Sequence, residues 1–202
     1  GRWVTPGLID VHSHLGVYAS PGVTAHQDGN EMTDPVTAGV WAEHGVWPQD
    51  PGFHAALVGG ITTLQVLPGS ANLIGGRGVT LRNVAGTTMQ EMKFPGAPHG
   101  LKMACGENPK RVYGGKGKSP STRMGNVAGY RQAFADAQDY RRQWQKYERE
   151  RATYEAQQDA GKSSRKKGDG DAKPPTMPKR DLRLETLVGA MDGEIQVHIH
   201  CY

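Results

Sequence analysis

Two histidines separated by one residue, His12 and His14, are the residues of this 202-residue sequence best suited to chemistry. They end a short apolar run that begins after a Pro-Gly pair. Alternate residues of a β-strand point to the same side, so a strand here would direct both imidazoles toward one point. Imidazole nitrogens are common ligands of zinc and other divalent ions. The spacing therefore predicts a metal site, and the alternative is that one histidine merely packs against its neighbours.

The wider segment, residues 6–14, reads Pro-Gly-Leu-Ile-Asp-Val-His-Ser-His. It resembles the first-strand signature of the amidohydrolase superfamily of metal-dependent hydrolases. The resemblance implies a (β/α)8 barrel with one or two divalent metals at the C-terminal mouth of its strands. It makes His12 and His14 metal ligands and places Asp10 on the same face as a buried supporting carboxylate. Zinc is the expected metal, with manganese or iron as alternatives.

A lysine within an apolar run is the next candidate. Residues 100–106 are predicted to form the fourth strand, and Lys102 lies inside it. A buried lysine is costly unless it is paired or modified. In many binuclear amidohydrolases a fourth-strand lysine is carbamylated and bridges two metals, and the resemblance implies this role for Lys102. Glu107 is the rival, since some single-metal relatives use a glutamate, and the structural alternative is that Lys102 extends its amine to the barrel rim.

The last candidates lie in a strictly alternating run at residues 194–202, which predicts the fifth strand. His198 and His200 share one face of this strand, opposite its apolar residues. The family places a metal-binding histidine on the fifth strand. His200 is the preferred ligand because it is nearer the C-terminal end, where the site would open, and His198 is the alternative.

Several elements must position these residues. The apolar residues at 8–11 do not alternate cleanly with polar ones, which predicts a strand buried on both faces. Further strands are predicted at 61–67 and 79–84, and Asp50 is the expected N-cap of a helix at 51–57. The long loop at 16–53 would lie on the active-site face. The loop at 68–78 is either a tight turn or a substrate loop that uses Asn72, Arg77 and backbone N–H groups.

The second half of the chain contains a strong helical pattern. Aromatic and apolar residues recur every three or four positions over 129–160. A polar, basic segment at 162–179 indicates a flexible linker, and 182–191 indicates a short amphipathic helix. The predicted fold is α/β, a partial (β/α)8 TIM-type barrel of about the first five strands with a long inserted helix. Its parts are four β/α units at 1–128, the helical insertion with its basic linker at 129–181, and a helix with the fifth strand at 182–202.

Composition adds limits. The formal net charge of +4 is mild, so no nucleic-acid partner is expected. Cys105 and Cys201 are far apart in sequence and fit no zinc-ribbon spacing, which favours two buried free thiols. No apolar run approaches the roughly 20 residues of a membrane span. A soluble protein of the cytoplasm or periplasm is expected, and a homo-oligomer is compatible with the sequence.

These observations predict a metal-dependent hydrolase of the amidohydrolase type. Its substrate would be a small molecule or peptide-like compound with a scissile C–N bond, in an amide, small peptide, cyclic imide or aminated ring. A complete barrel usually needs about 250 residues, so the chain is expected to be the first part of a longer protein with little activity alone. The family also uses a sixth-strand histidine and an eighth-strand aspartate, and both strands would follow this segment. The alternative is a non-catalytic metal-binding fragment or an interaction module built on the long helix.

Overall fold

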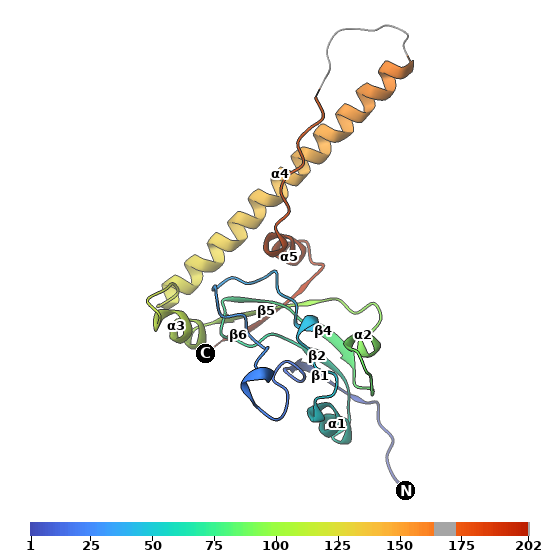
Figure 1. Cartoon of the computed structure of the whole chain (residues 1–202), viewed down its shortest axis with the longest axis vertical. Coiled ribbons are helices and arrows are strands. Elements are labelled where there is room, and N and C mark those ends of the chain that lie inside the picture. The colour runs from blue at the N-terminus through green and yellow to red at the C-terminus, as the bar shows by residue number, and fades with distance from the viewer. Residues whose placement is uncertain (164–172, 202) are drawn as a thin grey trace.

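A computed structural model describes residues 1–163 and 173–201 of the chain. It is a mixed α/β structure from which one long helix projects (Figure 1). The described strands form two three-stranded sheets, in the orders β1-β2-β4 and β3-β5-β6. The strands are β1 (Leu8–Ser13), β2 (Ile61–Val66), β3 (Ile74–Arg77), β4 (Val79–Arg82), β5 (Gly100–Cys105) and β6 (Gln196–Cys201). The α-helices are α1 (Pro51–Val58), α2 (Met89–Met92), α3 (Glu107–Gly114), α4 (Arg123–Ser163) and α5 (Leu182–Met191).

Local signals set most of these elements. Asp50 is the N-cap of α1, as predicted, and its side chain accepts a hydrogen bond from the Gly52 N–H. The predicted helix at 182–191 coincides with α5, which Asp181 caps through the backbone N–H groups of Arg183 and Leu184. Strands β2, β5 and β6 lie within the predicted ranges at 61–67, 100–106 and 194–202. Capping and hydrophobic periodicity were therefore sufficient to locate them.

A strand is present in the predicted range 79–84, but it does not run parallel to its neighbour as a (β/α)8 barrel requires. The observed strand, β4, pairs with β2 in an antiparallel ladder in which Leu64 faces Leu81. A parallel return needs a crossover of a dozen or more residues, usually a helix. The connection from β2 instead contains the short strand β3, which joins the other sheet by antiparallel pairing with β5. The described strands therefore form mixed sheets rather than a single parallel row.

The sequence predicted that the strand at residues 8–11 is buried on both faces, and this prediction is wrong for β1. Leu8, Ile9 and Val11 are 57%, 68% and 63% exposed. The physical reason is that β1 pairs only with β2 and lies at the edge of its sheet in the described structure. By contrast, β5 has neighbours on both sides and is buried through most of its length.

Two apolar clusters hold the described fold together. One packs β2 and β4 against α1 and α2, with Phe53, Leu64 and Met92 at its centre. The other packs β3 and β5 against α4 and α5 and includes Leu101 and Leu187. In Figure 1, α5 lies between α4 and the strands, α1 lies below the strands and α2 lies beside β4. Each sheet is thus covered by its own helices.

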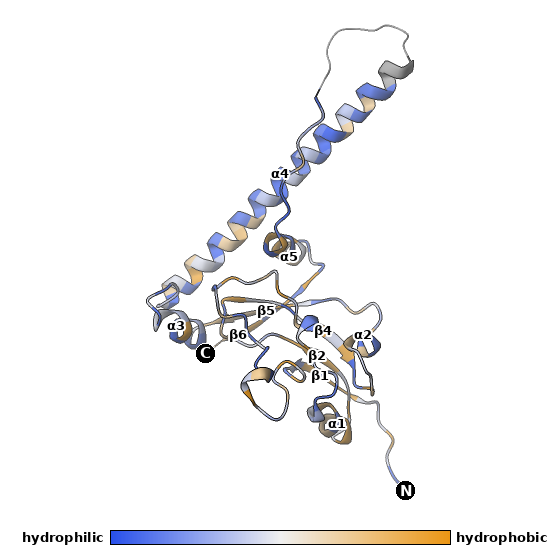
Figure 2. Ribbon diagram, in the orientation of Figure 1, coloured by the Kyte–Doolittle hydropathy of each residue, from blue (hydrophilic) through white to orange (hydrophobic). Residues whose placement is uncertain are grey.

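The long helix is longer than predicted. Helix α4 has 41 residues, whereas the sequence predicted a helix at 129–160. Residues 133–141 of α4 pack against α5 and its C-cap, and the distal half of the helix is largely hydrophilic (Figure 2). Part of the predicted linker, residues 164–172, lies outside the described residues, and residues 162 and 163 belong to α4. Within the described part of the chain, no helix has both the length and the apolar character of a membrane span.

Candidate metal centre

His12 lies near the end of β1, and His14 is the first residue after the strand, so the two histidines lie close together. The ring centroids of His12 and His14 lie 5.1 Å apart in an edge-to-face arrangement. The backbone N–H of His12 donates to Asp10 Oδ1 at 3.0 Å. Asp10 was expected to be buried; it is half-buried, and its contact is with the backbone of His12. The predicted convergence of the two imidazoles is therefore present.

A hydrogen bond at Nδ1 of His14 leaves its Nε2 atom available to bind a metal. Nδ1 of His14 lies 2.8 Å from the carbonyl oxygen of Leu67, at the end of β2. A carbonyl can only accept a hydrogen bond, so Nδ1 carries the proton and Nε2 keeps its lone pair. Such an outer hydrogen bond is the usual way in which a protein fixes the tautomer of a metal-binding histidine.

Lys102 lies within contact distance of this pair. Its side chain, 1% exposed, extends from β5 and donates from Nζ to His12 Nε2 across 3.1 Å. Burial lowers the pKa of Lys102 to about 8, and no acidic group in the described part of the chain opposes this shift. The lysine does not reach the rim of the fold. It is a desolvated amine whose neutral form is accessible near neutral pH.

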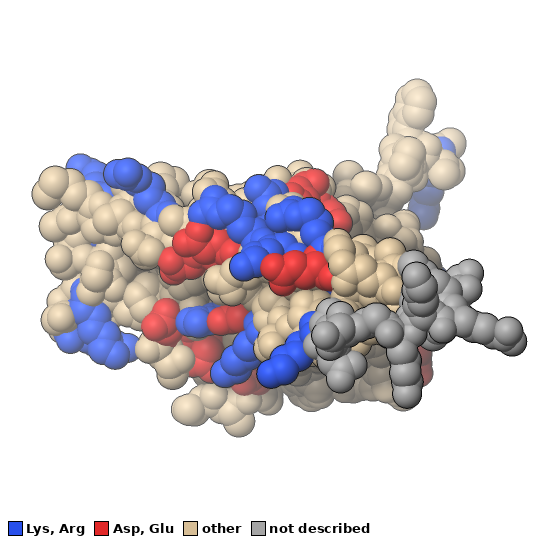
Figure 3. All heavy atoms as spheres, turned by 90° about the horizontal axis from the view of Figure 1, so that it is seen from above, with Lys and Arg blue, Asp and Glu red and all other residues tan. Residues whose placement is uncertain are grey.

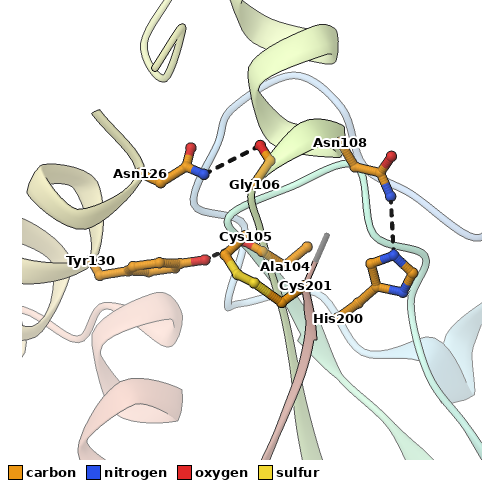
Figure 4. Close-up of a disulfide and its surroundings, with 8 residues drawn as sticks. All are labelled: Ala104, Cys105, Gly106, Asn108, Asn126, Tyr130, His200 and Cys201. Carbon is orange, nitrogen blue, oxygen red and sulfur yellow. Dashed lines mark hydrogen bonds between the residues drawn. A yellow bond between two sulfur atoms is a disulfide. The ribbon is translucent and has the colours of Figure 1, made fainter. Parts of the chain in front are cut away.

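Strand β6 adds histidines in register with β5. In the parallel pairing, His198 faces Lys102 and His200 faces Ala104. The His200 ring lies 6.5 Å from the His12 ring, and Asn108 Nδ2 donates to His200 Nε2 at 3.4 Å (Figure 4). The Nε2 atom of His198 is buried without a hydrogen-bond partner among the described residues. The approach of His200 to His12 favours His200 over His198.

The surroundings of three of these imidazoles disfavour their protonated forms. Burial lowers the pKa of His12, and the nearby Lys102, His14 and His200 lower it further. Burial is also the main cause of the lowered pKa of His14 and of His198. Neutral imidazole is the ligating form, so these lowered pKa values favour metal binding over protonation.

A covalent link, absent from the sequence expectations, lies beside these donors. Cys105 and Cys201 form a disulfide between the ends of β5 and β6 (Figure 4). The expectation of two buried free thiols is therefore wrong. The strands pair in parallel register so that these two residues face each other, with Cα atoms 4.7 Å apart, although 96 positions separate them in sequence. The disulfide fixes the strand end that carries His200 to the strand that carries Lys102.

Three other predicted residues are not part of this cluster. Glu107 is exposed at the start of α3 and takes no part in the contacts that join Lys102, His12 and His200. Asn72 is buried and donates to the backbone carbonyls of Glu31 and Asp34. Its amide oxygen and nitrogen both form hydrogen bonds within the fold.

Arg77 likewise does not serve as an exposed anion ligand. Its guanidinium lies over the Trp41 ring at 4.5 Å, and its Nε donates to Thr186 Oγ1 at 2.8 Å. It therefore joins the loop at 16–53 to α5. Other polar residues of that loop are also used structurally, as in the 2.6 Å ion pair of Glu43 with Lys93.

Sequence reasoning missed three residues that hold the site in place. Asn108 contacts His200, and the Tyr18 ring lies 5.8 Å from the His14 ring. Asp50 accepts a hydrogen bond from the backbone N–H of Gly16, in the loop that joins His14 to Tyr18. The Asp50 cap was visible in the sequence, but its second role was not. The contacts of Asn108 and Tyr18 depend on tertiary structure, so no local sequence pattern predicts them.

The donors fit a divalent metal by kind, although they do not form a closed ligand set. Within residues 1–163 and 173–201, no three His, Cys, Asp or Glu side chains are grouped closely enough to hold a metal ion. However, the His12 ring lies 5.1 Å from the His14 ring and 6.5 Å from the His200 ring, and Lys102 on β5 contacts His12. Neutral imidazoles with an anionic oxygen ligand would suit zinc. Only a modified lysine could supply that oxygen from the Lys102 position.

Comparison with known proteins supports the resemblance inferred from the sequence. No family model matches the chain. The curated protein "Amidohydrolase tasK" from Hapsidospora irregularis is 34% identical over the whole chain. A crystal structure of an amidohydrolase from Thermotoga maritima MSB8 is 34% identical over 97% of the chain, with a TM-score of 0.76. The chain spans about a fifth of the former protein and 45% of the latter.

Proposed function

We propose that this chain, related along its whole length to proteins named amidohydrolases, is the metal-binding part of a hydrolase that cleaves a C–N bond. The observation that carries the proposal is the approach of His14, Lys102 and His200 to His12, from two different sheets. The substrate class is an amide, small peptide, cyclic imide or aminated ring. The finer fold proposal is a partial (β/α)8 barrel, completed by residues outside this sequence.

The proposed ligands are the three histidines and a modified Lys102, with zinc as the first choice and manganese or iron as alternatives. A bound divalent cation would supply Lewis-acid activation of water and of the scissile carbonyl. The chain's own contribution is to hold the ligands in their binding forms. Leu67 fixes the tautomer of His14, and burial lowers the pKa of His12 and of His14, which favours their ligating form.

We further propose that Lys102 is carbamylated in the metal-loaded protein. The neutral amine attacks the carbon of CO2: an N–C bond forms, the π pair of one C=O bond moves to its oxygen, and an amine proton leaves to solvent. The product is a carbamate anion that provides two oxygen atoms. Burial and the lowered pKa of about 8 both favour the required neutral amine. An anion at this position would also be attracted to a cation held by the surrounding imidazoles.

The long helix gives less support for an interaction module. Its distal half carries charges of both signs in local pairs, such as Lys146–Glu150 and Arg151–Glu155. On the face of the molecule shown in Figure 3, acidic and basic side chains are likewise intermixed. A nucleic-acid surface would instead present a predominantly basic patch. This observation gives no reason to replace the hydrolase proposal.

Metal analysis of the full-length protein tests the proposal. The double variant His12→Ala/His14→Ala should lose most of its bound metal, because two ligands from one strand are removed. His54→Ala is the matched control, since His54 is an exposed histidine on α1 outside the cluster. Unchanged metal content in the double variant would refute the assignment of these ligands. Hydrolysis of a panel of dipeptides and cyclic amides by the full-length protein then tests the reaction class.

A further inference from the structure

Tyr18 is held directly against His14 by the backbone that connects them. After β1, the N–H of Tyr18 donates to the carbonyl of His14 at 3.1 Å, which folds the chain back on itself. Gly16, with a φ of 79°, permits this turn. The Tyr18 ring then packs edge-on to the His14 imidazole, with 5.8 Å between ring centroids. The tyrosine therefore forms one wall of the space around this histidine.

A buried carboxylate fixes the turn that carries Tyr18. Asp50, 3% exposed, accepts hydrogen bonds from the N–H groups of Gly16 at 2.9 Å and Ser20 at 3.2 Å. The same side chain caps α1 through Gly52. Charge-assisted bonds of this kind are stronger than neutral ones. The loop on either side of Tyr18 is thus attached to a helix end rather than free to move independently.

Two glycines make the space that the tyrosine fills. A Cβ placed on Gly29 would lie 2.2 Å from Tyr18 Cζ, and one placed on Gly69 would lie 2.7 Å from the Tyr18 hydroxyl oxygen. Both distances are far below van der Waals contact, so no larger residue fits while the ring keeps its place. The backbone N–H of Gly69 donates to the Gly29 carbonyl at 2.8 Å, which closes this seat.

The hydroxyl of Tyr18 is tied to a polar network. It donates to Asn30 Oδ1 at 2.7 Å, and Asn30 Nδ2 donates to Asn72 Oδ1 at 3.0 Å. Asn72 is buried and lies 2.9 Å from the Tyr113 hydroxyl on α3. Burial raises the pKa of Tyr18, so the phenol remains a neutral donor. The ring is therefore held by His14, by the Gly29–Gly69 seat and through its hydroxyl, while 37% of the residue stays exposed.

We infer that Tyr18 is a positioning residue for His14, and that the Gly29–Gly69 seat and the Asn30–Asn72 pair hold it in place. This inference rests on the proposed metal site. The hydrogen bond to Leu67 fixes one atom of the imidazole, and a ring can still tilt about a single anchor. The Tyr18 edge supplies the second contact, which restricts that tilt and keeps Nε2 directed toward the other donors.

The test uses the full-length protein with Co²⁺ alone as a probe, measured by absorption spectrum and affinity. Tyr18→Leu removes the ring and should weaken Co²⁺ binding about 10-fold or more and alter the spectrum, as outer contacts of metal ligands do. Tyr18→Phe keeps the ring and should stay within about 3-fold of wild type, because its hydroxyl acts only on the ring position. Tyr140→Leu is the control: Tyr140 is a buried tyrosine bonded to Glu185 between α4 and α5. It should leave the Co²⁺ spectrum unchanged.

A second pair of variants leaves Tyr18 itself intact. Gly29→Ala should displace the ring and reproduce the spectral change of Tyr18→Leu. Gly22→Ala should not, because a Cβ at Gly22, in the same loop, meets no atom within 4 Å. Wild-type spectra and affinities in both Tyr18→Leu and Gly29→Ala would overturn the inference while the metal site stands. Absence of Co²⁺ binding in the wild type would overturn both proposals together.

Discussion

The two sides of the candidate metal centre are built in different ways. The β5–β6 side places Lys102 in a buried central strand and joins the strand ends by the Cys105–Cys201 disulfide. The β1 side places its histidines on an exposed edge strand, where hydrogen bonds to Asp10 and Leu67 and the contact with Tyr18 fix them. One side is thus positioned by core packing and a covalent bond. The other depends on polar contacts from loops.

Removing the disulfide should give the largest effect, and it should fall on the β5–β6 side. Cys105→Ser/Cys201→Ser opens a loop of 96 residues, for which chain entropy gives about 4–5 kcal/mol. Hydrogen exchange of the full-length protein should show lower protection of β5 and β6 amides, with β1 and β2 little changed. Treatment of the wild type with a thiol reductant is the matching control. Equal loss of protection in both sheets would contradict the division into two sides.

The buried lysine should give the next effect, visible as a pH dependence. Because burial lowers the pKa of Lys102 from 10.5 to about 8, the folded chain binds fewer protons than the unfolded chain between these values. Stability should therefore rise as pH increases from about 8 to 10.5, and below pH 8 the full cost, about 3 kcal/mol, applies. In CO2-free, metal-free buffer, the unfolding midpoint of wild type should rise relative to Lys102→Met between pH 7.5 and 9.5. Parallel pH profiles of the two proteins would show that the amine is not desolvated.

On the β1 side, Asp50→Ala should cost about 2 kcal/mol, since it removes the cap of α1 and the acceptor for two loop N–H groups. Asp50→Asn retains one acceptor oxygen and should cost less. Faster exchange of the Gly16 and Ser20 amides, with β5 unchanged, is the expected signature. Unaltered exchange at those two amides would show that Asp50 does not hold the loop in place.

The smallest effect should come from the edge strand itself. Leu8 is 57% exposed, so Leu8→Ala should cost less than about 1 kcal/mol in the 202-residue chain. If further strands complete a barrel, the same substitution should cost about 2 kcal/mol or more in the full-length protein, since Leu8 would then be buried. Urea unfolding of the short chain and hydrogen exchange of β1 in the long one measure the two values. Equal small costs would argue against a neighbour for β1.

The sequence predicted what local spacing controls. His-x-His spacing placed two imidazoles together, a lysine in an apolar run was found buried, the Asp50 cap marked α1 and an amphipathic pattern marked α5. The direction of β4 could not be predicted, because it depends on the pairing of β3 with β5 in the other sheet. The disulfide depends on the register of β5 and β6, and the Tyr18 contact depends on a loop fold. Strand pairing and loop structure are tertiary properties that no single segment encodes.

The central claim is that His12, His14, His200 and a carbamylated Lys102 bind one metal centre. Anomalous diffraction at the zinc edge, from crystals of the full-length protein grown with zinc and bicarbonate, tests it most directly. The account predicts an anomalous peak among the three imidazoles and electron density extending beyond Lys102 Nζ. A fully occupied zinc site elsewhere, or one among these histidines beside an unmodified Lys102 that points away, would contradict it.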